Sequence, residues 1–177
     1  VYALGAILRC SLNSSSLFSF QQELDLLRNY MTIQEIRYED RLLFSLEGPP
    51  EVMQYELPKM TLLPLVENAI RYAVDENVDP CHIWVDVNLL PAEIRIFVRN
   101  TGSHFEEGIL EKLDHSKKES HGFGIGLHNI QQRIKLTYGP EYGLTVYNQE
   151  EMAVVEIRLP RKPYTGGNEN VKMHDRR

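Results

Sequence analysis

His121-Gly122-Phe123-Gly124-Ile125-Gly126-Leu127-His128-Asn129 places three alternating glycines directly before a helical pattern of apolar residues. Glycine tolerates positive φ angles and lets other groups approach the backbone closely. A helix that begins behind such a loop presents unpaired N–H groups and the positive end of its dipole. The segment therefore predicts a binding place for phosphate, and a second feature is needed to say of which kind.

The second feature lies upstream in residues 62–72, where Glu67, Asn68 and Arg71 interrupt an otherwise apolar helical pattern. Spacings of three and four bring these side chains to one face of a helix. Magnesium prefers oxygen ligands and takes few of them from the protein. Asn68 with Glu67 beside it therefore suggests a Mg²⁺ site, and Arg71 could meet a phosphate. The alternative is a solvated face on which Glu67 and Arg71 form a weak ion pair.

A third polar feature, Arg99-Asn100-Thr101-Gly102, follows an apolar run that is predicted to be a strand. Ligands commonly bind at strand ends, so these residues could contact a ligand. The alternative is an ordinary turn, which Asn and Gly favour.

Two familiar phosphate loops are excluded. The chain has no Gly-x-x-x-x-Gly-Lys-Ser/Thr motif. Its glycine spacing is not Gly-x-Gly-x-x-Gly, and polar residues 114–120 stand where a dinucleotide-binding turn needs a strand.

Composition fits one soluble domain with extensions, at 177 residues and 42% hydrophobic. The net charge of −6, with scattered basic residues, gives no indication of a nucleic-acid partner. Cys10 and Cys81 form no close-spaced pair and are interpreted as reduced thiols. No apolar run reaches the roughly 18 residues of a membrane span, and no signal peptide is visible. Because the chain starts at Val1 without methionine, we expect a piece of a longer protein.

Hydrophobic periodicity predicts a helix over residues 20–38. Its apolar stripe could pack on its own domain or serve a two-chain bundle, and it comprises Phe20, Leu24, Leu27, Met31 and Tyr38. Glu23, Asp25, Arg28 and Glu35 are placed on the polar side. Residues 1–12 are also helix-compatible.

The remaining pattern predicts a layer of helices on one face of a single mixed β-sheet, an α/β (α+β) two-layer sandwich. Alternation indicates strands around residues 42–46, 83–87, 94–98, 144–146 and 155–159. Helices are predicted over 60–74, opened by Leu57-Pro58, over a short 106–113, and from Leu127 to Tyr138, ending at Gly139-Pro140. The polar residues 161–177 are expected to be a mobile tail.

In their order, these motifs resemble the ATP-binding catalytic domain of sensor histidine kinases, within the gyrase, Hsp90, histidine kinase and MutL superfamily, and more narrowly its LytS/YesM-like branch. The matching text begins with Glu23-Leu24, Tyr30, Ile33-Gln34, Arg37, Leu57-Pro58 and Leu63-Pro64-Leu65-Val66-Glu67-Asn68-Ala69-Ile70. It continues with Asn100-Thr101-Gly102, Gly122 to Asn129, Arg133 and Arg158-Leu159-Pro160.

The resemblance implies a Bergerat-type ATP-binding fold over residues 39–160, a remnant of the helical dimerisation stem over 1–38, and a tail over 161–177. It implies ATP and Mg²⁺ as ligands, with Asn68 on the metal and Glu67 and Arg71 in the catalytic set. Asn100 would accept from the adenine amino group, and Gly102 would give the base room. Gly122, Gly124, Gly126 and Leu127 would form the nucleotide-binding lid segment.

Three positions depart from the family pattern. The adenine-reading residue is usually Asp, and Asn100 is a neutral, weaker acceptor by about 1 kcal/mol. His104 replaces the second glycine of that box, and Ala153 stands where a threonine is usual near adenine. We therefore expect weak nucleotide affinity.

None of the six histidines has the sequence context of a phosphoacceptor; they are His82, His104, His115, His121, His128 and His174. The acceptor is expected upstream of Val1, so this chain alone should bind nucleotide without phosphorylating itself. The resemblance further implies a response regulator as partner, a homodimer through the stem, and a cytoplasmic domain of a membrane sensor. Two alternatives stay open: a non-catalytic nucleotide-binding interaction module, and an anti-sigma serine kinase or ATP-driven clamp of the same superfamily.

Overall fold

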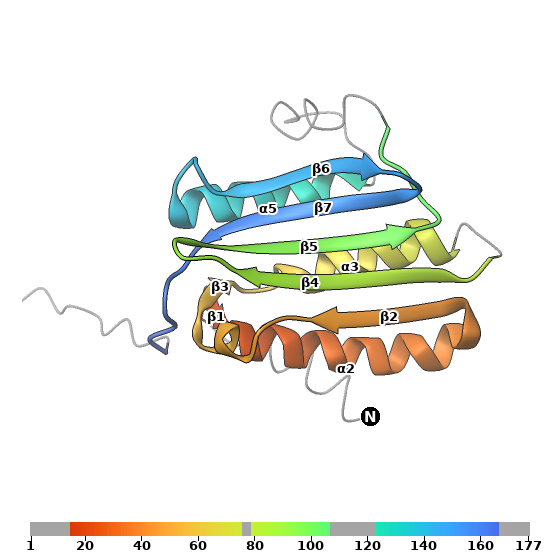
Figure 1. Cartoon of the computed structure of the whole chain (residues 1–177), viewed down its shortest axis with the longest axis horizontal. Coiled ribbons are helices and arrows are strands. Elements are labelled where there is room, and N and C mark those ends of the chain that lie inside the picture. The colour runs from red at the N-terminus through yellow and green to blue at the C-terminus, as the bar shows by residue number, and fades with distance from the viewer. Residues whose placement is uncertain (1–14, 76–78, 107–122, 167–177) are drawn as a thin grey trace, which may run out of the picture.

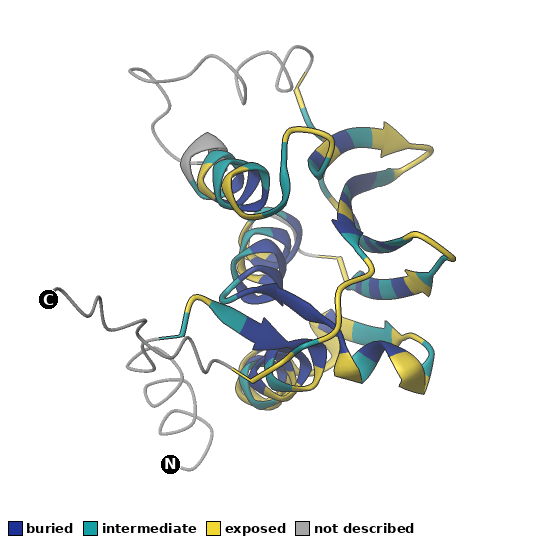
Figure 2. Cartoon of the chain, turned by 90° about the vertical axis from the view of Figure 1, so that its left-hand side faces the viewer, coloured by how far each residue is buried: buried dark blue, intermediate teal, exposed yellow. Residues whose placement is uncertain are grey.

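The structure, a computed structural model, describes residues 15–75, 79–106 and 123–166. Five strands form one sheet in the order β2-β4-β5-β7-β6: Leu42–Glu47, Cys81–Leu89, Glu93–Thr101, Met152–Pro160 and Gly143–Gln149. β2 runs parallel to β4, and the other neighbours are antiparallel. Three helices cover one face: α2 (Phe20–Tyr38), α3 (Leu62–Ile70) and α5 (Phe123–Tyr138). Figure 2 shows this helical layer beside the sheet, which confirms the predicted two-layer architecture.

Strict alternation of burial along the central strands explains the layering. On β4 the buried side chains are Cys81, Ile83, Val85 and Val87, and on β5 they are Ile94, Ile96, Val98 and Asn100. Their neighbours in the sequence point to the open face of the sheet. Asn100 thus lies on the helix side, at the C-terminal end of β5, where the rest of the row is apolar.

Helix α2 has the predicted bounds and closes its N-terminus with a capping box between Ser19 and Gln22. The apolar stripe of α2 is buried in the same core as the sheet, so it packs on its own domain. The assignment of Glu23 to the polar side is wrong, because Glu23 is fully buried. Its carboxylate accepts N–H groups at the start of α3, and that contact satisfies the charge.

A small two-stranded sheet precedes α3 and was not predicted. β1 (Leu17–Ser19) pairs antiparallel with β3 (Glu56–Pro58). The expectation that Leu57-Pro58 opens a helix is therefore wrong, because these residues complete a strand ladder and Lys59 N–H donates to Ser16 O at 3.0 Å. Two 3₁₀ turns, Glu39–Arg41 and Pro50–Gln54, flank β2.

The helix predicted over residues 60–74 begins later and changes its winding. α3 is α-helical to Ile70 and continues as a π-helical turn, Arg71–Asp75. α5 ends as predicted: Gly139 has φ +110° and donates to Lys135 O at 2.9 Å. No helix in the described ranges has the length and apolarity needed to cross a bilayer.

The expectation of a mobile tail is wrong for the first residues after β7. Glu56 N–H donates to Lys162 O at 2.9 Å and Tyr164 N–H to Gln54 O at 2.7 Å, so this segment is fixed against the β3 region. Arg161 Nε also donates to Tyr55 Oη at 2.6 Å. The expectations for residues 1–12, for residues 167–177 and for most of the 106–113 helix fall outside the described residues.

Burial of the α2 stripe predicts that α2 unfolds together with the sheet. Leu27→Ala should lower the free energy of unfolding by about 2–5 kcal/mol, because Leu27 is fully buried. Ile36→Ala, on the same helix but 76% exposed, should change it by less than about 0.5 kcal/mol. Chemical denaturation followed by circular dichroism measures both values. A separate early transition for α2 would contradict the single core.

Candidate nucleotide site

The two segments singled out in the sequence meet where α3 packs on α5. A Cβ atom added at Gly126 would lie 3.4 Å from the side-chain nitrogen of Asn68. Gly126 and the Asn68 amide therefore lie side by side, separated by about the width of one methyl group. The structure brings together two residues that lie far apart in the chain and that were selected for different reasons.

Asn68 is, with Glu67, one of the two polar residues of an otherwise apolar helix. Its neighbours on α3 are mostly buried, including Val66, Ala69 and Ile70, and this burial fixes the helix and the direction of the amide. The amide nitrogen itself is buried and has no hydrogen-bond partner within the described part of the chain. An unpaired buried amide costs about 1–3 kcal/mol, so a ligand that pairs with it would recover that free energy.

Glu67 and Arg71 flank Asn68 and are both exposed. They form no ion pair with each other within the described residues, and the Arg71 guanidinium lies 5.5 Å from the centroid of the Tyr72 ring. Nearby protein atoms desolvate the Glu67 carboxyl and raise its pKa. Burial raises the pKa of the Tyr30 hydroxyl, and the Glu67 charge raises it further. Glu67 thus faces partly shielded surroundings although its side chain reaches solvent.

Asn100 is 6% exposed at the end of β5. Its amide nitrogen donates to Thr101 O at 2.9 Å and to Ser103 Oγ at 2.7 Å. These two bonds orient the side chain and leave its oxygen without a partner among the described residues. An oriented, unpaired acceptor on the helix side of the sheet is what recognition of an amino group requires.

Ala153 lies opposite Asn100 in the β5–β7 ladder. It is 3% exposed, so the position suggested from the sequence as a second adenine contact does lie beside the first. Gly102 follows with φ +82°, a left-handed conformation that favours glycine. His104, which replaces the second glycine of the family pattern, is exposed. Its Nε2 lies 3.4 Å from Glu150 O.

The glycine segment differs from its predicted form. α5 begins at Phe123, so Gly124 and Gly126 lie in its first turn rather than in a loop, and Gly122 falls outside the described residues. The buried stripe Leu127, Ile130 and Ile134 explains the early start, because it holds the helix on the core. Since the Leu127 side chain is fully buried, any ligand contact of Leu127 would come from its backbone.

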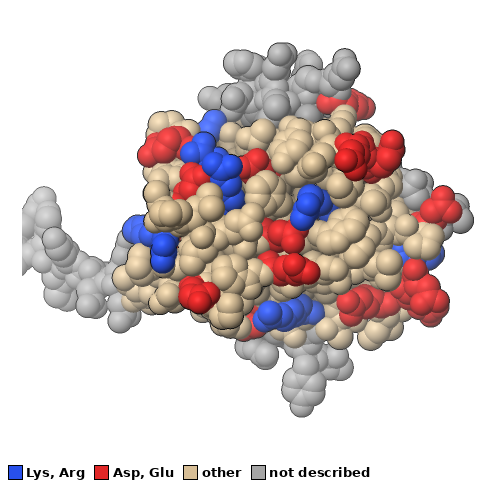
Figure 3. Space-filling model, viewed as in Figure 1, with Lys and Arg blue, Asp and Glu red and all other residues tan. Residues whose placement is uncertain are grey.

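The open face of the sheet carries a polar hollow that sequence reasoning missed. A cavity of about 270 Å³ is lined by Asp86, Asn88, Phe97, Arg99, Tyr147 and Gln149. Asp86 and Arg99 form an ion pair there. Figure 3 looks onto this face and shows acidic and basic side chains interspersed over it. The hollow lies on the face opposite Asn68 and Asn100.

Among the histidines of the described ranges, His82 lies on the sheet and contacts other side chains there. His82 stacks on Trp84 with ring centroids 3.8 Å apart, and its Nε2 lies 2.8 Å from Ser45 Oγ. Desolvation by burial lowers the pKa of His82. Within the described residues, no group of three or more His, Cys, Asp or Glu is placed to hold a metal ion.

Comparisons with known proteins extend over the whole domain. The family model for histidine kinase-, DNA gyrase B-, and HSP90-like ATPases matches residues 55–163, and the histidine kinase model matches residues 1–42. The sensor histidine kinase YesM of Bacillus subtilis is 40% identical over 162 residues, 90% of this chain and 27% of that protein. The sensor protein LytS of Oceanobacillus iheyensis is 29% identical over 150 residues, 83% of this chain and 26% of that protein. The chain spans about a quarter of the length of these curated relatives.

Solved structures share the fold. The nucleotide-free catalytic domain of histidine kinase ThkA aligns with a TM-score of 0.64 at 19% identity, covering 84% of this chain and 100% of that chain. ThkA in complex with the response regulator TrrA aligns with a TM-score of 0.60 at 21% identity, over 93% of this chain and 48% of that chain.

Proposed function

This chain belongs to the family of histidine kinase-, DNA gyrase B-, and HSP90-like ATPases, and from that premise we propose that it is the ATP-binding catalytic domain of a two-component sensor histidine kinase. The observation that carries the proposal is the meeting of Asn68 and Gly126 at the contact of α3 with α5. A second match of the chain, residues 1–42 with the histidine kinase model, supports the kinase over the anti-sigma factor and the clamp.

ATP would bind on the helix side of the sheet. The oxygen of Asn100, for which the described residues supply no partner, would accept from the adenine amino group, with Ala153 beside it in the ladder. The phosphates lie toward α3 and the first turn of α5, whose N–H groups have no partner inside the helix. Gly126 leaves the space beside Asn68 into which a phosphate oxygen can enter.

The residues present fit a magnesium ion held together with the phosphates. The unpaired nitrogen of Asn68 can donate to a phosphate oxygen, its amide oxygen would face the metal, and Glu67 adds a carboxylate next to it. Two such oxygen donors with phosphate and water oxygens meet the preference of Mg²⁺ for hard ligands. Bound there, the ion supplies positive charge to the phosphate oxygens. Arg71 is exposed on the following turn, from which its side chain can swing toward a phosphate.

The reaction that we propose for the whole protein is phosphoryl transfer. An imidazole nitrogen forms the new bond to the γ-phosphorus, the bond from that phosphorus to the β–γ bridging oxygen breaks, and ADP leaves. The phosphohistidine then passes its phosphoryl group to an aspartate of a response regulator. We place the acceptor histidine outside this chain, in a helical stem that also forms the homodimer, and we propose a membrane-anchored sensor with this domain in the cytoplasm.

Titration of the chain with a fluorescent ATP analogue, with and without Mg²⁺, tests the proposal. We expect saturable binding that Mg²⁺ strengthens and unlabelled ATP displaces, and no phosphohistidine on the chain alone. Binding that Mg²⁺ does not affect would favour the non-catalytic module, a reading supported by Ala153 beside Asn100. No binding at all would overturn the function.

Asn100→Ala should remove the preference for adenine. The variant loses one hydrogen bond, so its affinity for ATP should fall by about fivefold to tenfold. The affinity for ITP, whose base lacks the amino group, should change by less than about twofold. Competition titrations of both nucleotides measure the ratio. Ser103→Ala is the matched control, since it removes one of the two partners of the Asn100 nitrogen and keeps the Asn100 oxygen and the bond to Thr101 O. Equal losses for ATP and ITP would contradict the adenine assignment.

A further inference from the structure

A short segment that leads into α3, Lys59-Met60-Thr61 with the first helical residue Leu62, is held from three directions; we refer to it as the 59–62 junction. From the N-terminal side, Ser16 O accepts from Lys59 N–H at 3.0 Å. From α2, the Glu23 carboxylate accepts from Met60, Thr61 and Leu62 N–H at 2.5, 3.1 and 3.1 Å. From α5, Arg133 Nη2 donates to Met60 O at 2.7 Å.

Glu23 replaces the usual side-chain cap of α3. Thr61, at the N-cap position, makes no cap hydrogen bond with its own side chain and donates its hydroxyl to Pro58 O instead. Glu23 has no solvent exposure, and a carboxylate so buried is tolerated only where donors surround it. Burial raises its pKa, while the three N–H groups and the Arg133 charge oppose that change.

The junction is also a strained point of the backbone. Met60 has φ +59°, a left-handed conformation that costs a non-glycine residue of order 1 kcal/mol. The contacts of Glu23 and Arg133 with its N–H and C=O groups hold it there. Loss of either contact would let Met60 relax and would move the start of α3.

The position of the junction links it to the candidate site. Two contacts join this region to α5: Asn68 of α3 lies beside Gly126, and Met60 of the junction accepts from Arg133. Asn68 lies six positions after Leu62 and Arg133 seven positions after Gly126, which at about 1.5 Å per residue gives about 10 Å along each helix. The two helices are thus held at both ends of an antiparallel contact: Asn68 with Gly126 lies at the site end, and the junction with Arg133 lies at the far end, from which it sets the direction of α3 toward the site.

We propose that Glu23 is a positioning residue for the nucleotide site: through the 59–62 junction it sets the placement of α3 against α5, and so couples the arrangement of α2 to nucleotide affinity. This inference rests on the proposed function. The Glu23 carboxylate joins α2 to the first N–H groups of α3, so a displacement of α2 would act on the placement of α3.

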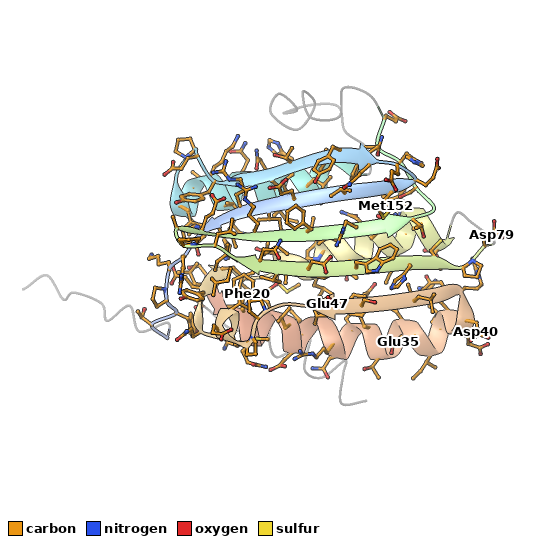
Figure 4. All side chains as sticks on the ribbon, viewed as in Figure 1. Phe20, Glu35, Asp40, Glu47, Asp79 and Met152 are labelled. Carbon is orange, nitrogen blue, oxygen red and sulfur yellow. The ribbon has the colours of Figure 1, made fainter. Side chains whose placement is uncertain are left out.

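Glu23→Gln tests the role, because it keeps the shape and replaces one acceptor oxygen with a donor facing N–H groups. The dissociation constant of Mg·ATP should rise by at least about fivefold at a temperature where circular dichroism shows the variant folded. Glu35→Gln makes the same change at an exposed site of the same helix (Figure 4) and should stay within about twofold of the unchanged chain.

A variant that destabilises the fold at a distant position distinguishes the positioning role of Glu23 from a purely stabilising one. Ile94→Val lies in the core at the other end of β5 from Asn100, and should lower Tm without changing nucleotide affinity while the chain stays folded. By reciprocity, Mg·ATP should slow hydrogen exchange of Met60 and Thr61 amides in the unchanged chain and not in Glu23→Gln.

An unchanged dissociation constant in Glu23→Gln, with a lowered Tm, would overturn the positioning role alone. An unchanged chain that binds no nucleotide would overturn this inference together with the proposed function. If Glu23→Gln shows no cooperative unfolding transition, Arg133→Lys takes its place, since it keeps the charge and removes the planar donor pair; the same fivefold criterion then decides.

Discussion

Asn68→Ala is expected to weaken binding of Mg·ATP by about 10- to 150-fold. A hydrogen bond or ligand contact to a charged group contributes about 1.5–3 kcal/mol, and each 1.4 kcal/mol corresponds to a factor of ten. The fold should be retained, because the variant removes a buried amide nitrogen that has no partner in the described structure. Isothermal titration calorimetry gives the affinity and thermal denaturation gives the stability.

The matched control is Asn88→Ala, an exposed position on the open face of the sheet. Its nucleotide affinity should equal that of the unchanged chain. Binding should also lose its dependence on Mg²⁺ in Asn68→Ala if this residue holds the ion. Full Mg²⁺-dependent affinity in Asn68→Ala would contradict the assignment.

Gly126 gives the second large effect, with stability and binding moving in opposite directions. Gly126→Ala should raise the free energy of unfolding by about 0.5–1 kcal/mol, because alanine is the better helix residue. It should nevertheless weaken nucleotide binding, since its Cβ would fill the space 3.4 Å from the Asn68 nitrogen. Gly126→Val, with two further methyl groups there, should weaken binding by about 5- to 150-fold, the equivalent of about 1–3 kcal/mol of overpacking.

The control for a β-branched residue in α5 is Leu136→Val, at a position that is 85% exposed. It shares the helix-propensity cost and leaves the Asn68 side untouched. Loss of binding in Leu136→Val equal to that in Gly126→Val would mean that the effect comes from the helix and not from the site.

The sequence was sufficient for those elements whose periodicity is long and regular. The alternation along β4 and β5 and the stripe of α2 predicted both the elements and their buried faces. β1 and β3 were missed because three-residue strands carry no periodic signal, and each is defined only by its partner. The π-helical turn after Ile70 likewise depends on packing that no local pattern encodes.

Glu23 shows the corresponding limit for polar residues. Periodicity treats a carboxylate on a helix as solvent-facing, and only the approach of the α3 N–H groups makes its burial favourable. For the site, the structure places Asn68 beside Gly126 and Ala153 beside Asn100, with Asn100 facing the helix side of the sheet, while the roles assigned to these residues stay predictions. The sequence could not show that Gly124 and Gly126 lie inside α5, since glycine is rated a helix breaker.

A crystal structure of this chain with Mg²⁺ and a non-hydrolysable ATP analogue tests the central claim most directly. The account predicts phosphate density between Asn68 and the first turn of α5, with the adenine amino group at the Asn100 oxygen. Nucleotide density in the hollow between Asp86 and Tyr147 on the open face, with the α3–α5 contact unchanged, would contradict it.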